Sequence, residues 1–147
     1  MQKDIEALND VTKTMIDSYK GYEQCLEVAE DSFPLTNSFR QRATRRSELI
    51  NEFQAEVRSL GGEPETDGSA LGSAHRAWLN VTAVFQDDRK AAVEAIDDGE
   101  EFLADKIENA LQDETYSPRT RELLQTAQMS AREGERFAEA MEAALER

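Results

Sequence analysis

The chain has 147 residues, a length that fits one domain with one core, and 33% of them are charged while 39% are hydrophobic. Its 31 acidic residues outnumber the 17 basic ones and give a formal charge of −14, a field that repels nucleic acid and anionic membrane surfaces. The single cysteine, Cys25, excludes an internal disulfide and a thiolate metal cluster, and no stretch is apolar enough to span a membrane. We expect an all-α cytoplasmic protein with no nucleic acid partner and no membrane partner.

The first predicted helix is about 28 residues long and ends near Asp31, just before Phe33 and Pro34. Its inward positions alternate three-residue and four-residue steps, which is the spacing of one face of an α-helix. This stripe consists of Ile5, Leu8, Thr12, Met15, Tyr19, Tyr22, Leu26 and Ala29.

The second predicted helix opens at Pro34 and ends at the glycine pair Gly61 and Gly62. Two of its inward positions, Arg42 and Arg46, are arginines among apolar residues. The loop signal that begins at Gly61 continues to Ser69, and its length favours a crossover over a tight hairpin.

A shorter helix is predicted for residues 70–85, and Asp88 can cap the helix that follows it. The inward stripe of that next helix includes Glu100. Ser117 as N-cap and Pro118 at the first helical position then begin the last helix. These elements predict an antiparallel four-helix bundle with an additional shorter crossover helix, in a single domain over residues 1–147.

Charged residues on the inward stripes need partners, because an unpaired buried charge is costly. Tyr19, Arg46 and Glu100 each fall near the middle of their helices, so we expect them to form one buried polar layer. A guanidinium and a carboxylate pair well through two parallel hydrogen bonds, and such a pair can fix the register of a bundle. The layer is interpreted as structural, with a functional pocket as the alternative.

Three motifs follow one another along the chain: Gly61-Gly62-Glu63-Pro64, Leu71-Gly72-Ser73-Ala74-His75-Arg76-Ala77-Trp78-Leu79 and Asp98-Gly99-Glu100-Glu101. With these motifs in this order, the chain resembles, over nearly its whole length, a bacterial ferritin-like four-helix-bundle family of unknown function. The resemblance implies the bundle with a crossover, and it brings no activity with it.

The wider ferritin-like group holds two metal ions with helix glutamates and two Glu-x-x-His motifs. This chain has one histidine, His75, in the predicted crossover, and Arg46 and Gly134 stand where that resemblance implies ligands. We therefore expect no cofactor and no bound metal, with an ion pair in place of the metal centre. The alternative is iron or manganese bound by Glu100 with other helix glutamates, for which the candidates are Glu23, Glu52 and Glu133.

No phosphate-binding loop, nucleophile elbow or paired cysteine and histidine is present in the sequence, so an enzyme is the less favoured reading. We expect a non-catalytic bundle that acts as a stress-associated or scaffold and interaction protein. The alternative function is a di-iron or manganese carboxylate protein, an oxidase or an iron-handling protein. A homodimer of two-fold symmetry is left open, since bundles of this shape often bury one side in such a dimer.

Overall fold

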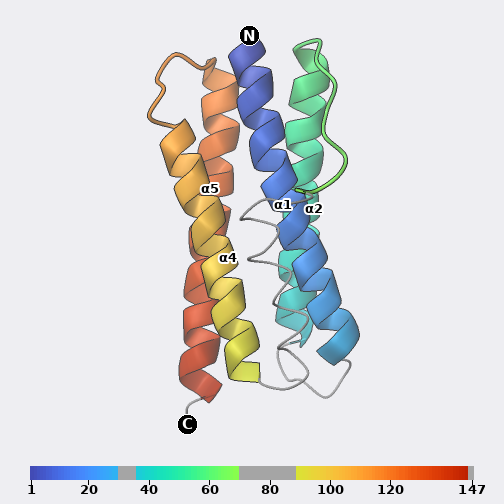
Figure 1. Cartoon of the computed structure of the whole chain (residues 1–147), viewed down its shortest axis with the longest axis vertical. Helices are drawn as coiled ribbons and strands as arrows, with labels where there is room; N and C mark the ends of the chain where they lie inside the picture. Colours follow the sequence, from blue (N-terminus) through green and yellow to red (C-terminus); the bar gives the residue numbers. More distant parts are fainter. Residues whose placement is uncertain (30–35, 70–88, 146–147) are drawn as a thin grey trace.

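The computed structural model describes residues 1–29, 36–69 and 89–145, and over these ranges the chain contains helices and no strand. The described helices are α1 (Gln2–Ala29), α2 (Thr36–Ser59), α4 (Arg89–Ala110) and α5 (Pro118–Leu145). They lie side by side in one bundle (Figure 1). The predicted all-α bundle is confirmed. The predicted helix over residues 70–85 lies outside the described residues, as do Pro34, His75 and Asp88.

The helices form a ring in which every neighbour is antiparallel. α1 packs along α2 and α4 packs along α5, while sparser contacts of α1 with α4 and of α2 with α5 close the ring. In Figure 1, α1 and α5 run from top to bottom, and α2 and α4 run from bottom to top. Because α2 and α4 run in the same direction, α2 ends and α4 begins at opposite ends of the bundle (Figure 1).

α2 ends at the predicted glycine pair. Gly61 has a φ of 84°, in the left-handed region that favours glycine. The Gly62 N–H donates to the Val57 carbonyl at 2.9 Å, and the Gly61 N–H donates to the Arg58 carbonyl at 3.0 Å. These two hydrogen bonds form a Schellman motif, which satisfies carbonyls that the last turn of the helix would leave without a donor.

The segment after α2 returns alongside α1 instead of forming a hairpin. The Asn9 side chain accepts a hydrogen bond from the Glu65 N–H and donates one to the Glu63 carbonyl. Two turns further along α1, the Asp17 carboxylate accepts the Ser69 N–H at 3.1 Å. The first part of the crossover is therefore fixed to α1 through polar side chains of that helix.

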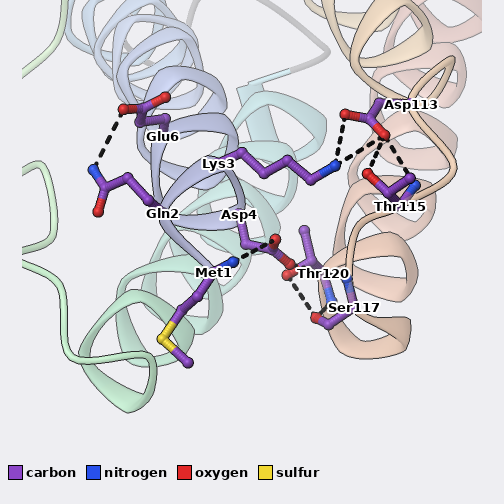
Figure 2. A network of polar contacts seen from close by, with 9 residues as sticks. All are labelled: Met1, Gln2, Lys3, Asp4, Glu6, Asp113, Thr115, Ser117 and Thr120. Atoms are coloured by element: carbon purple, nitrogen blue, oxygen red, sulfur yellow. Dashed lines mark hydrogen bonds and ion pairs between the residues drawn. The ribbon is translucent and has the colours of Figure 1, made fainter.

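α5 begins with the predicted cap, which also holds the start of α1. The Ser117 hydroxyl accepts the Thr120 N–H, as an N-cap should, and Pro118 is the first helical residue. Asp4 of α1 accepts the Ser117 N–H at 3.0 Å, and Lys3 pairs with Asp113 at 3.0 Å (Figure 2). This network joins the first turn of α1 to the connection between α4 and α5.

The apolar core is divided into two clusters along the bundle. The larger cluster includes Leu8, Met15, Phe53, Leu103 and Leu124, and the smaller one includes Tyr22, Phe39, Ile96 and Met141. Polar and charged side chains that belong to neither cluster, Ser18, Arg46 and Glu100, are buried as well. The burial pattern thus identifies a polar site inside the bundle. No helix within the described ranges is both long and apolar enough to cross a membrane.

Candidate functional site

A guanidinium and a carboxylate face each other inside the bundle. Arg46 on α2 is 1% exposed, and Glu100 on α4 is fully buried. Arg46 Nη1 donates to Glu100 Oε1 at 2.9 Å and Arg46 Nη2 donates to Glu100 Oε2 at 2.8 Å. This is the two-bond geometry in which a guanidinium binds a carboxylate most strongly. The structure therefore brings together the two charged residues of the predicted polar layer.

The other helices supply neutral groups to the same pair. The Ser18 hydroxyl of α1 accepts a hydrogen bond from Arg46 Nη1 at 2.6 Å, and the Ser130 hydroxyl of α5 accepts one from Arg46 Nη2 at 3.3 Å. The Tyr22 hydroxyl of α1 donates to Glu100 Oε2 at 3.0 Å. All four described helices thus meet at this site.

The local charges keep Arg46 and Tyr22 protonated. Burial alone would lower the pKa of Arg46, but the adjacent Glu100 carboxylate outweighs it and raises that pKa. Burial, followed by the charge of Glu100, raises the pKa of Tyr22 far above its usual range. The phenol therefore remains a hydrogen-bond donor to the carboxylate, and neither group exchanges a proton near neutral pH.

A second arginine connects this site to the surface. Arg42 Nε donates to the Tyr22 hydroxyl at 3.3 Å, and Arg42 Nη2 lies 3.9 Å from Glu100 Oε2. Its guanidinium also lies over the Phe137 ring, 5.3 Å from the ring centroid, which is a cation–π distance. The Arg42 side chain is 17% exposed, so water solvates part of its guanidinium charge. This matters because the single charge of Glu100 does not neutralise both arginines.

Gly134 provides the space that the Glu100 carboxylate occupies. A Cβ atom built on Gly134 would lie 2.5 Å from Glu100 Cδ and would collide with Oε2. The space next to Gly134, where the resemblance implied a metal ligand, is therefore filled by the carboxylate itself. Only a residue without a side chain leaves room there for Glu100 in its present conformation.

The tyrosine of the layer is Tyr22 rather than Tyr19, and this corrects the expected set. The Tyr19 side chain is partly exposed, and its hydroxyl donates to the exposed Glu23 at 2.9 Å. Both tyrosines lie on the same predicted stripe, three residues apart. Helical spacing identifies the stripe, but the rotation of α1 about its axis decides which tyrosine points at Glu100.

The alternative metal ligands do not converge on Glu100. Glu23 is exposed on α1, while Glu52 and Glu133 line a surface depression between α2 and α5. Both oxygens of Glu100 already accept hydrogen bonds from Arg46. Glu100 could bind a metal ion only after losing that guanidinium.

The described residues do contain one group of three carboxylates, which the sequence did not reveal. One oxygen each of Asp97 on α4 and of Glu135 and Glu139 on α5 lie within 4.8 Å of one another. Burial, followed by the charges of Glu139 and Glu135, raises the pKa of Asp97 to about 6. Arg132 Nη1 offsets part of this repulsion by binding Glu135 Oε1 at 2.7 Å.

Replacing Asp97 with asparagine should stabilise the protein at pH 7 and not at pH 4. Because the pKa of Asp97 rises from 3.8 to about 6 on folding, the folded state binds more protons between these values and stability falls as the pH rises through them. The Asp97 side chain is partly exposed, and solvent screens part of the repulsion. The expected gain in the free energy of unfolding at pH 7 is therefore about 1 kcal/mol or less. Urea unfolding at both pH values measures it, with the exposed Glu94→Gln on α4 as the control. An equal gain at pH 4 would contradict the explanation.

The buried Cys25 has no part in this chemistry. Burial raises the pKa of its thiol to about 12, so the thiolate that would act as a nucleophile is not formed near neutral pH. Cys25 packs with the smaller apolar cluster. It is a core residue.

The sequence pattern of one protein family matches residues 3–113, a range that covers α2, α4 and all of α1 except its first residue. The chain belongs to this family, a domain of unknown function (DUF2383). Arg46, Glu100 and Tyr22 lie in the part that matches, while Ser130 and Gly134 of α5 lie beyond it. Comparisons with curated proteins and with solved structures give no match.

Proposed function

We propose that this DUF2383 protein is a non-catalytic, ferritin-like bundle of one domain that works in the cytoplasm as a scaffold or interaction protein. The observation that carries the proposal is the buried ion pair of Arg46 and Glu100, which occupies the level of the bundle where a metal centre would need several inward carboxylates. A guanidinium at this position repels a divalent cation and holds both carboxylate oxygens. The acidic surface disfavours nucleic acid as a partner.

The site also lacks the properties of a general acid or base. An effective catalytic group titrates near the working pH and reaches the proton that it transfers. Tyr22 stays protonated, and Glu100 is fully buried with both of its carboxylate oxygens bound by Arg46. These features support a structural role in which the pair fixes the helices relative to one another.

Iron or manganese binding is the second candidate, and the observation that favours it is the group of Asp97, Glu135 and Glu139 rather than Glu100. Carboxylate oxygens suit hard divalent cations, and a cation would relieve the repulsion that raises the pKa of Asp97. The ion pair of Glu135 with Arg132 competes with such binding.

Metal content by mass spectrometry, on protein purified without chelator, followed by titration with ferrous iron, tests both candidates. We expect no stoichiometric iron or manganese, and a melting temperature that a chelator does not change. About two ions per chain, lost in Glu100→Gln, would overturn the proposal and restore the di-metal centre. Metal that is retained in Glu100→Gln and lost in Glu135→Gln would instead establish the second candidate.

A further inference from the structure

The surface between α2 and α5 is hollowed directly outside the buried ion pair. A depression of about 350 Å³ is lined from α2 by Arg42, Arg45, Glu48, Leu49 and Glu52, and from α5 by Thr126, Met129, Ser130 and Glu133. Met129 is 65% exposed, the highest value for a large hydrophobic side chain within the described helices. An apolar side chain here lies among charges of both signs.

Three exposed charges on the same face of α2, Arg45, Glu48 and Glu52, have no partner in the described part of the chain. Arg45 and Glu52 are both exposed, and no hydrogen bond or ion pair joins either one to another described residue. They are seven residues apart, which is about two helical turns and about 10 Å along the axis. Opposite charges at this spacing are complementary to a second α2 helix that runs in the reverse direction.

We propose that a second copy of this chain docks on the α2–α5 face through a two-fold axis that passes beside Glu48 and Leu49. The axis lies midway between Arg45 and Glu52, so it places Arg45 of each copy opposite Glu52 of the partner subunit. A two-fold contact is made by the same surface on both copies, so each ion pair between Arg45 and Glu52 across the interface occurs twice. Met129, which is exposed in the same depression, then supplies apolar contact.

The size and charge of the face are compatible with a dimer. α2 has 24 residues and is about 36 Å long, and two neighbouring helices are about 20 Å wide, giving roughly 700 Å² per copy. A standard interface buries about 800 Å² per partner. Glu48 lies beside the proposed axis, where its negative charge opposes association, but its side chain is exposed and also borders a second depression, between α1 and α2, so water solvates it. The formal charge of −14 on each copy opposes association, and physiological salt screens that repulsion beyond about 8 Å.

A charge exchange on the full-length protein tests the proposal. Sedimentation equilibrium should give a dimer at concentrations on the order of 100 μM. The single substitutions Arg45→Glu and Glu52→Arg should each raise the dissociation constant of the dimer by about tenfold or more. In each single variant the two facing side chains carry the same charge, and the two-fold symmetry repeats this repulsion at both contacts. The double variant Arg45→Glu with Glu52→Arg should restore dimerisation, because the exchanged charges again face their opposites.

The matched control is Lys20→Glu, which changes the net charge as Arg45→Glu does but lies exposed on α1, away from this face. Lys20→Glu should leave the dissociation constant within about twofold of the unsubstituted protein. Circular dichroism should show the same helix content in all variants, since the substituted side chains are exposed. A monomer at every concentration, or a dimer that the single changes do not weaken or the double variant does not restore, would overturn the proposal. This inference deepens the proposed interaction role, and its failure would leave the result of the metal measurement unaffected.

Discussion

Replacing Arg46 with leucine should lower the free energy of unfolding by about 3 to 5 kcal/mol. The substitution removes both hydrogen bonds to the Glu100 oxygens and leaves a fully buried carboxylate without its closest positive charge. Arg42 remains as an ion pair, but its Nη2 lies 3.9 Å from Glu100 Oε2, beyond hydrogen-bond distance, so it does not replace the two lost hydrogen bonds. The Ser18 and Ser130 hydroxyls also lose the donor that they accept from.

Urea unfolding followed by circular dichroism measures this loss at a protein concentration on the order of 1 μM, where association does not contribute. The matched control is Arg45→Leu, one residue earlier on α2 and exposed, which should change stability by about 0.5 kcal/mol or less. A loss for Arg46→Leu no larger than that of the control would mean that the pair does not stabilise the fold.

The double variant Arg46→Leu with Glu100→Leu should recover much of the loss. Removing one partner strands a buried charge, whereas apolar replacement of both members of a buried pair is often close to neutral. Arg46 Nε has no hydrogen-bond partner in the described part of the chain, so even the native pair is not fully satisfied. A double variant less stable than Arg46→Leu alone would show that the pair contributes more than apolar packing can replace.

The parts of the fold that local chemistry determines could be predicted from the sequence. Gly61 ends α2 because its backbone adopts a left-handed φ, and Ser117 with Pro118 begins α5 because they satisfy the first turn. Arg46 and Glu100 could be paired in advance because each is a charged residue near the middle of its inward stripe. These inferences need only the spacing of residues along a helix and the cost of burying a charge.

The parts that depend on how the helices are rotated and aligned could not be predicted. α1 buries Val11, Ser18 and Cys25 in addition to its predicted stripe, because it contacts α2, α4 and the segment after Gly62. This wider buried face explains why the layer contains Tyr22 and not Tyr19. The group of Asp97, Glu135 and Glu139 was missed for the same reason, since it forms across two helices whose alignment no single-helix pattern gives.

The position of the ion pair suggests why a bundle of this length retains it. It lies between two apolar clusters, one that includes Leu8, Phe53 and Leu124 and another that includes Tyr22 and Phe39. Apolar side chains tolerate a helix sliding by a turn, whereas a two-bond pair is satisfied at one alignment only. The layer therefore selects the register in which α2 and α4 face each other at Arg46 and Glu100.

Replacing Gly134 with alanine should destabilise the protein by about 1 to 3 kcal/mol, although alanine is the better helix former by about 1 kcal/mol. The added Cβ would overlap the Glu100 carboxylate, which Arg46 and Tyr22 hold in place. Relieving the overlap means moving a buried charge away from its hydrogen bonds. Steric overlap and loss of those bonds together outweigh the gain in helix propensity.

The sign of this effect should reverse when the carboxylate is removed. In a Glu100→Ala background the space next to residue 134 is empty, so Gly134→Ala should stabilise that variant by about 1 kcal/mol through helix propensity alone. Urea unfolding of the four proteins gives the coupling between the two positions. Equal destabilisation in both backgrounds would show that Gly134 is required by the α5 backbone rather than by Glu100. A reversal would show that residue 134 is glycine because the Glu100 carboxylate occupies the space that a side chain at this position would need.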